Sequence, residues 1–203
     1  MKNPFLIGPR VYLRPLERAD VPVLQTWIND QDVIRNLLNF RPMNREAEEE
    51  FVDKITRDPD LLVLGITLRS DDRLIGDAAL HRIQSRDRQA GFGILIGEKA
   101  EWSKGYGTEA TRLIVRYAFD VLNLHRVWLH VLEDNQRGTR AYEKVGFKIE
   151  GVLRQSAFRE GRYLDMITMG ILRGELIEES KKAERDGRAR RPSRSLPRAR
   201  RGR

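Results

Sequence analysis

The chain has 203 residues, a net charge of +8 and no cysteine. This length fits one domain with a tail, and the lack of cysteine excludes disulfide bonds and thiol chemistry. The first residues contain no apolar run typical of a secretory signal, and no run approaches the ~18 residues of a membrane span. We therefore expect a soluble, cytoplasmic protein.

The positive charge is concentrated at the C-terminal end of the sequence. Residues 173–203 carry 12 Lys and Arg against 5 Asp and Glu, whereas residues 1–172 carry 26 against 25. Residues 188–203 contain eight Arg and no acid, mixed with Pro, Ser and Gly. Such a composition cannot bury much apolar surface, so we expect a disordered tail. The tail either contacts RNA, the ribosome or another polyanion, or is a solvated extension without a role.

Apolar spacing divides residues 1–172 into alternating strands and helices. Asp20 and Asn44 are suited to cap two early helices, a central helix begins at Thr108, and Asn135 opens a short helix with a basic face. The expected strands are 11–13, 61–69, 74–82, 92–96, 125–132, 147–159 and 162–172.

This order of elements predicts an α+β fold with a mixed sheet of about seven strands and helices on both faces. The strands 92–96 and 125–132 are joined through a helix, which implies a parallel pair with a right-handed crossover. The two hairpins, 61–82 and 147–172, supply antiparallel pairs.

The turn before the central helix contains Ser103-Lys104-Gly105-Tyr106-Gly107-Thr108. The first N–H groups of a helix lack intrahelical partners and lie at the positive end of its dipole. Gly105 and Gly107 allow the backbone to curl until several N–H groups point at one anion, and Lys104 adds positive charge. The turn is a candidate diphosphate site, although a tight turn without a ligand explains the two glycines equally well.

Other phosphate and metal sites are less well supported. No P-loop string occurs. Gly105-x-Gly107-x-x-Ala110, with Glu133 after the next strand, matches the dinucleotide fingerprint, but too few residues follow for a Rossmann domain of the usual ~150 residues. His81, His125 and His130 are isolated without metal-ligand spacing, so we expect no metal.

The strings at 102–110 (WSKGYGTEA) and 142–147 (YEKVGF), with Asn135 between them, together resemble the GNAT superfamily of N-acetyltransferases. They are most similar to the branch of ribosomal-protein N-terminal acetyltransferases and spermidine acetyltransferases. The resemblance covers nearly all of residues 10–172 and decides against a nicotinamide enzyme. It implies an acetyltransferase domain at 1–172, a separate tail at 173–203, and a mostly antiparallel sheet whose central parallel pair splays apart to admit acetyl-CoA.

The resemblance also implies which residues bind acetyl-CoA. The backbone of Leu95 and Ile96 would pair with the pantetheine arm, and Asn135 would bond the pantetheine or acetyl region. Two positions depart from the family pattern, because Trp102 replaces the usual Arg or Gln and Gly138 replaces a small hydroxyl residue. The N–H groups expected to hold the pyrophosphate belong to Ser103, Lys104, Gly105, Tyr106, Gly107 and Thr108.

The family's chemistry is direct transfer from the thioester to a neutral amine. Tyr142 matches the tyrosine that protonates the leaving thiolate, although a core-packing tyrosine is the alternative. A backbone N–H near Ile96 is a candidate for stabilising the oxyanion. Glu98 and Glu101 are candidates to hold a water that accepts the amine proton, or are solvated turn carboxylates.

The acceptor amine is less well specified by the sequence. We expect a protein N-terminal α-amine of the ribosomal-protein type, with a polyamine or another small amine as one alternative. A catalytically weak module that docks on RNA or the ribosome through 188–203 is the other. Residues 27–43 and 158–165 are expected to shape the acceptor site, and a dimer is compatible with the sequence.

Overall fold

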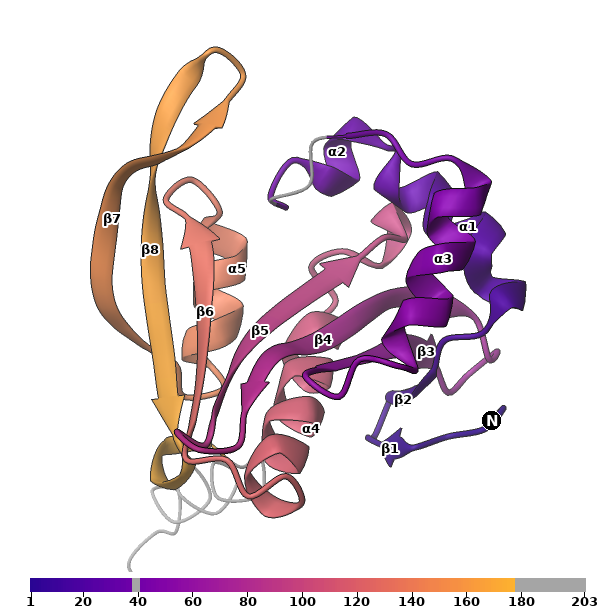
Figure 1. Ribbon diagram of the computed structural model, residues 1–203, viewed down its shortest axis with the longest axis horizontal. Coiled ribbons are helices and arrows are strands. Elements are labelled where there is room, and N and C mark those ends of the chain that lie inside the picture. The colour runs from indigo at the N-terminus through magenta and orange to yellow at the C-terminus, as the bar shows by residue number, and fades with distance from the viewer. Residues whose placement is uncertain (38–40, 178–203) are drawn as a thin grey trace, which may run out of the picture.

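The computed structural model describes residues 1–37 and 41–177. Its strands form one sheet in the order β1-β2-β3-β4-β5-β6-β8-β7, in which only β5 and β6 run parallel (Figure 1). The expected mixed, mostly antiparallel α+β fold is confirmed. The sheet has eight strands rather than seven, because the short β1, Leu6–Ile7, pairs with β2 at the edge.

The other strands are close to their expected positions. They are β2 (Val11–Pro15), β3 (Leu61–Leu68), β4 (Leu74–Gln84), β5 (Gln89–Ile96), β6 (Arg126–Leu132), β7 (Lys148–Arg159) and β8 (Arg162–Leu172). The α-helices are α1 (Val21–Ile28), α2 (Gln31–Ile34), α3 (Arg45–Ile55), α4 (Tyr106–Asp120) and α5 (Gln136–Glu143), with 3-10 turns η1 (Arg18–Asp20), η2 (Lys99–Glu101) and η3 (Arg173–Glu175).

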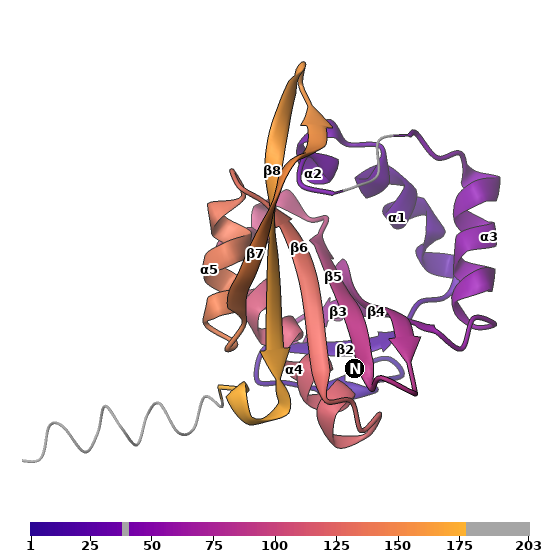
Figure 2. The ribbon, with the colours of Figure 1, turned by 60° about the vertical axis from the view of Figure 1, so that its left-hand side comes forward.

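Helices cover both faces of the sheet, as expected (Figure 2). On one face, α4 buries Ala110, Ile114 and Ala118 completely against the larger hydrophobic core. On the other face, α1 and α3 cover a second apolar cluster that contains Trp27 and Val52. The sheet therefore separates two apolar layers. Residues of β5, α2, α4 and α5 together line the pocket that is described below.

The central parallel pair splays apart. β5 and β6 are in register only from Gln89–Arg126 to Gly91–Trp128. Beyond that point β5 stays paired with β4 while β6 stays paired with β8, and the two strands diverge (Figure 1). Residues 92–96 of β5 therefore present one backbone edge that no neighbouring strand of the described sheet occupies.

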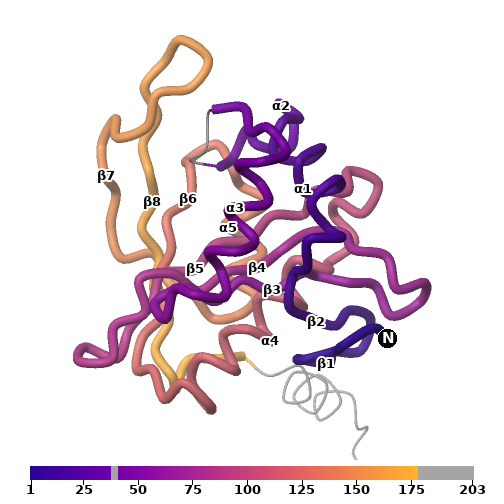
Figure 3. Tube along the Cα trace, turned by 45° about the vertical axis from the view of Figure 1, so that its right-hand side comes forward, coloured from indigo at the N-terminus to yellow at the C-terminus, as the bar shows by residue number. Residues whose placement is uncertain are grey.

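The sheet's two edges lie far apart, with β1 and β2 at one side and β7 at the other (Figure 3). The tip of the β7–β8 hairpin nevertheless reaches the α2 segment. Arg35 forms an ion pair with Glu160 at 3.3 Å, and Arg159 Nη2 donates to the carbonyl of Leu37 at 2.6 Å. These contacts bring together the two segments, 27–43 and 158–165, that were expected to shape the acceptor site.

Packing continues past the expected domain boundary at 172. The backbone N–H of Ile177 donates to the carbonyl of Val145 at 2.9 Å. The Arg-rich segment 188–203 lies outside the described residues. Among the helices that are described, none has the length and apolar character needed to span a membrane.

Candidate active site

The glycine turn curls through two residues in the left-handed region. Ser103 has φ of 62° and Gly105 has φ of 86°, and Gly105 is the N-cap of α4. The helix starts at Tyr106, two residues before the expected Thr108, so Gly107 lies inside its first turn. A left-handed residue directly before a helical one, as at Gly105 and Tyr106, turns successive N–H groups toward one side and makes an anion-binding concavity.

Gly107 leaves open room rather than allowing an unusual backbone conformation. A Cβ at this position would meet only Ile96 and Ile94 side-chain atoms, at the ordinary contact distances of 3.7 and 3.8 Å. The protein alone therefore does not require glycine here. A ligand that approaches the helix N-terminus closely does, and this observation fits the pyrophosphate of CoA.

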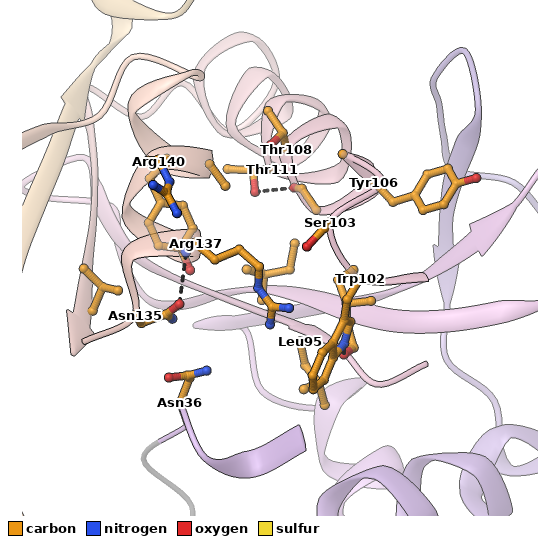
Figure 4. Close-up of a pocket in the computed structure, with 18 of the residues that line it drawn as sticks. Asn36, Leu95, Trp102, Ser103, Tyr106, Thr108, Thr111, Asn135, Arg137 and Arg140 are labelled. Atoms are coloured by element: carbon orange, nitrogen blue, oxygen red, sulfur yellow. Dashed lines mark hydrogen bonds between the residues drawn. The ribbon is translucent and has the colours of Figure 1, made fainter. Parts of the chain in front are cut away.

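The turn is held from outside by the N-terminal segment. The buried carboxylate of Glu109 accepts hydrogen bonds from the backbone N–H groups of Arg10 and Val11, at 2.7 and 3.0 Å, and from Arg10 Nε at 2.9 Å. Arg10 Nη1 also donates to the carbonyl of Lys104 at 2.9 Å. The Arg10 guanidinium lies 5.0 Å from the centre of the Tyr106 ring, which points out of the pocket (Figure 4).

A pocket of about 310 Å³ lies between the open edge of β5, the start of α4, and α5. It gathers most of the residues expected from the sequence. Lys104 and Glu98 are not among the residues that line it. The expected residues that do are Leu95, Ile96, Glu101, Ser103, Gly105, Tyr106, Gly107, Thr108, Asn135 and Tyr142.

The two candidate bases are in positions that do not favour proton transfer. Glu101 accepts from Lys104 Nζ at 2.9 Å and from Arg73 Nη2 at 2.8 Å, and these hydrogen bonds lower its pKa. A carboxylate stabilised as an anion is a poor proton acceptor. Glu98 accepts from the N–H of Ala100 at 3.4 Å and so caps η2. Lys104, expected to face the anion, instead pairs with Glu101.

Tyr142 packs in the core and also lines the pocket, a position compatible with either role that the sequence left open. Its ring packs against Phe92 and Phe147, with centroid distances of 6.1 and 5.9 Å. It also lines the pocket, and its hydroxyl makes no hydrogen bond to any other described residue. Burial raises the pKa of Tyr142 to about 12. The phenol therefore stays protonated at neutral pH, which is the state a proton donor needs.

Asn135 caps α5 with its side-chain oxygen, which accepts from the N–H of Gly138 at 3.0 Å (Figure 4). A Cβ at position 138 would lie 2.7 Å from Asn135 Nδ2. Glycine at this position therefore lets the asparagine side chain fold over the helix start. A larger side chain at position 138 would therefore have to displace the Asn135 side chain from this cap.

Sequence reasoning assigned no role in the pocket to Arg137. Its guanidinium lies 4.4 Å from the centre of the Trp102 ring, and both residues line the pocket (Figure 4). Trp102 Nε1 donates to the carbonyl of Ile96 at 2.7 Å. Arg140 lines the pocket as well. The signal available was the basic face of the short helix, where Arg137 and Arg140 are three residues apart.

Within 1–37 and 41–177 there is no group of three or more His, Cys, Asp or Glu residues that could hold a metal ion.

Comparison with known proteins identifies the family. The family model "Acetyltransferase (GNAT) domain" matches residues 10–148. The chain is 33% identical over 175 residues to the probable N-acetyltransferase YjcK of Bacillus subtilis, covering 82% of this chain and 96% of that protein. It is 31% identical over 172 residues to spermidine N(1)-acetyltransferase of Escherichia coli K12, covering 84% and 90% of the two chains.

A solved structure gives the same assignment. Spermidine N-acetyltransferase of Vibrio cholerae, in complex with CoA and spermine, matches with a TM-score of 0.77 and 29% identity, covering 81% of this chain and 96% of that one. The splayed strands, the glycine turn and Tyr142 lie within residues 10–148, which the family model matches. The chain belongs to the GNAT family and is an acetyl-CoA-dependent N-acetyltransferase.

Proposed function

We propose that the acceptor of this acetyltransferase is a polyamine or a similar small cationic amine. The observation that carries the proposal is the 31% identity to a spermidine N(1)-acetyltransferase across 90% of that protein's length. The similarity to the Vibrio cholerae enzyme solved with CoA and spermine supports the same choice. These relatives give no support to the expected ribosomal-protein branch, so a protein N-terminal α-amine becomes the alternative.

The geometry suits direct transfer inside the pocket. Acetyl-CoA, when bound, supplies an acetyl group activated as a thioester. The N–H groups of the turn, including those of Gly105 and Gly107, would hold its pyrophosphate, and the open edge of β5 at Leu95 and Ile96 would pair with the pantetheine arm. Tyr142 would give its proton to the leaving thiolate. Glu98 and Glu101 are not assigned as the base, given their hydrogen bonds.

The acceptor must be neutral when it reacts. An alkyl ammonium has a pKa near 10.4 and an α-ammonium a pKa of about 7.7–8.0, so a polyamine needs more help to lose its proton. The rate with a polyamine should therefore rise steadily as the pH increases from 7 to 9, more steeply than with an α-amine peptide.

A thiol-release assay with acetyl-CoA tests the proposal. Spermidine, spermine, a monoamine and a peptide with a free α-amine are compared at the same concentrations. We expect the highest kcat/KM with the polyamines. Tyr142→Phe serves as the background control for all four acceptors. Preference for the peptide would replace the polyamine proposal with the N-terminal one. Turnover with none of them, despite CoA binding, would favour a binding module.

We also propose that residues 188–203 contact a polyanion, because they contain eight Arg and no acid. Deleting residues 181–203 should leave the acetylation of a small amine unchanged, since every pocket residue lies upstream. It should weaken RNA or ribosome binding and flatten its dependence on salt. Equal affinity of the full and shortened chains for ribosomes at low salt would remove this proposal.

A further inference from the structure

The face of the sheet under α1 and α3 has open space beside β5, the strand that is expected to pair with the pantetheine arm of acetyl-CoA. A Cβ built on Gly93 of β5 would have no other atom within 4 Å. Gly93 pairs in register with Ala79 of β4, and two residues further along β5 lies Leu95, which lines the cofactor pocket. Alternate residues of a strand point to the same face, so this space and the Leu95 side chain lie on one side of the sheet.

Asp77 projects from β4 on that same face. It is in register with Leu95, and side chains of directly paired residues lie about 4.5–5.5 Å apart at Cβ. Its strand neighbours on this face, Leu95 and Ala79, belong to the apolar cluster beneath α1 and α3. Asp77 is thus a carboxyl group in apolar surroundings, next to the strand that the acetyl donor is expected to follow.

A second carboxyl group comes from α3. The Glu48 side chain is 4% exposed, and its Oε2 is buried without a hydrogen-bond partner. Burial raises the pKa of Glu48, and burial together with the charge of Glu48 raises the pKa of Asp77 to about 7. Glu48 lies one helical turn before Val52, which packs on the same apolar cluster as Ala79 and Leu95, so Glu48 faces the side of the sheet from which Asp77 projects.

Asp77 is half-buried and Glu48 is buried, and their surroundings differ from those of the other buried acids of the described chain. Glu101 is paired with Lys104 and Arg73, and Glu109 is paired with Arg10. No hydrogen bond or ion pair with another described residue reaches the side chain of Asp77 or Glu48. Buried charges in proteins are normally paired, so the unpartnered Oε2 of Glu48, on the face that also carries the half-buried Asp77, indicates that a partner comes from outside the chain.

We propose that Asp77 and Glu48 bind the non-reacting ammonium group of a diamine or polyamine acceptor. The inference rests on the proposed function and deepens it. The reacting amine must be neutral at the thioester, whereas the next nitrogen along a polyamine keeps its proton and charge. Asp77, directly in register with Leu95, and Glu48 above it give that ammonium a charged partner while the other end of the molecule reaches β5.

The test compares two acceptors with the same four-carbon chain, putrescine and butylamine, which differ only in the second ammonium. Asp77→Asn and Glu48→Gln keep the shape of each side chain and remove its negative charge. We expect kcat/KM for putrescine to fall about 10- to 100-fold in each variant, the size expected for a lost hydrogen bond to a charged group. The value for butylamine should change by no more than about twofold, and acetyl-CoA affinity should not change.

Glu50→Gln is the matched control, because Glu50 lies on the same helix but is exposed. It should leave both acceptors unchanged. Equal losses for putrescine and butylamine would overturn the inference, since the carboxyl groups would then act on the reacting amine or on the fold. Unchanged kcat/KM for putrescine would overturn it as well. A wild-type enzyme that does not prefer putrescine or spermidine over butylamine would instead remove the proposed function itself, and the ammonium site with it.

Discussion

Arg137 and Trp102 connect the two walls of the pocket, with the guanidinium carbon 4.4 Å from the centre of the indole ring (Figure 4). Trp102 immediately precedes the glycine turn, whereas Arg137 belongs to the first turn of α5. The indole N–H is fixed on the carbonyl of Ile96 at 2.7 Å. The arginine therefore rests on a ring that is itself anchored to the end of β5.

Removing this contact should weaken CoA binding. Arg137→Ala loses a cation–π contact that contributes about 0.5–1 kcal/mol, or roughly 2- to 5-fold in Kd, plus the attraction of a positive charge for phosphates. The loss should be larger at low salt than at high salt, because salt screens that attraction. Calorimetric titration with CoA at two salt concentrations measures both effects.

Arg137→Lys separates the two contributions, because it keeps the charge but not the planar group that stacks on indole. It should recover the salt dependence and only part of the affinity. In a double-mutant cycle, Arg137→Ala and Trp102→Ala should be clearly non-additive. Additive losses would show that the two residues do not act as a pair.

Gly107→Ala tests the close approach of the pyrophosphate. The added Cβ fits the protein, where its nearest neighbours are at 3.7 and 3.8 Å, and alanine favours a helix by about 1 kcal/mol over glycine. The melting temperature should therefore stay the same or rise, while Kd for CoA increases, and more so in Gly107→Val. An unchanged Kd in both variants would show that no phosphate approaches this position.

Tyr142→Phe removes only the hydroxyl and leaves the ring between Phe92 and Phe147. If the phenol protonates the thiolate, kcat should fall by about 10²–10⁴-fold with little change in acetyl-CoA affinity. Because the pKa of Tyr142 is raised to about 12, the wild-type rate should not decline through ionisation of this group below pH 10. A variant that turns over near the wild-type rate would leave Tyr142 only its packing role.

Local patterns were sufficient to predict the fold. Alternating apolar runs placed the strands within a few residues, and the side chain of Asn44 caps α3 as expected, accepting from the N–H of Ala47 at 2.9 Å. The start of α4 was misplaced because Gly107 was assigned to the turn. Its φ is not in the left-handed region, so it is an ordinary helical residue that the sequence cannot distinguish from a turn glycine.

The site was predictable only where a motif is continuous in sequence. Contacts between distant segments were missed, since no local pattern links Glu109 to Arg10 or Glu101 to Arg73. The same limit applies to Lys104 and Glu101. Their charges were read as facing a ligand, whereas in the fold they face each other.

The two unpaired carboxyl groups should lower stability as the pH rises. The pKa of Asp77 is 3.8 ordinarily and about 7 in the folded protein, because of burial and the nearby Glu48. Between these pH values the folded state binds more protons at this site than the unfolded state, so its contribution to the free energy of unfolding decreases with increasing pH. For a single group this slope is at most about 1.4 kcal/mol per pH unit.

Asp77→Asn carries no ionisable group, so its stability relative to the wild type should increase from pH 5 to pH 7 and level off above that. Glu48→Gln should act in the same direction, because burial also raises the pKa of Glu48. Denaturant unfolding of the three proteins at pH 5, 6, 7 and 8 measures the differences, in which the titration of all other groups largely cancels. Glu50→Gln, which removes an exposed carboxylate of the same helix, should show a nearly constant difference. If the advantage of Asp77→Asn is the same at every pH, or shrinks as pH rises, then Asp77 does not titrate near neutrality in the folded protein.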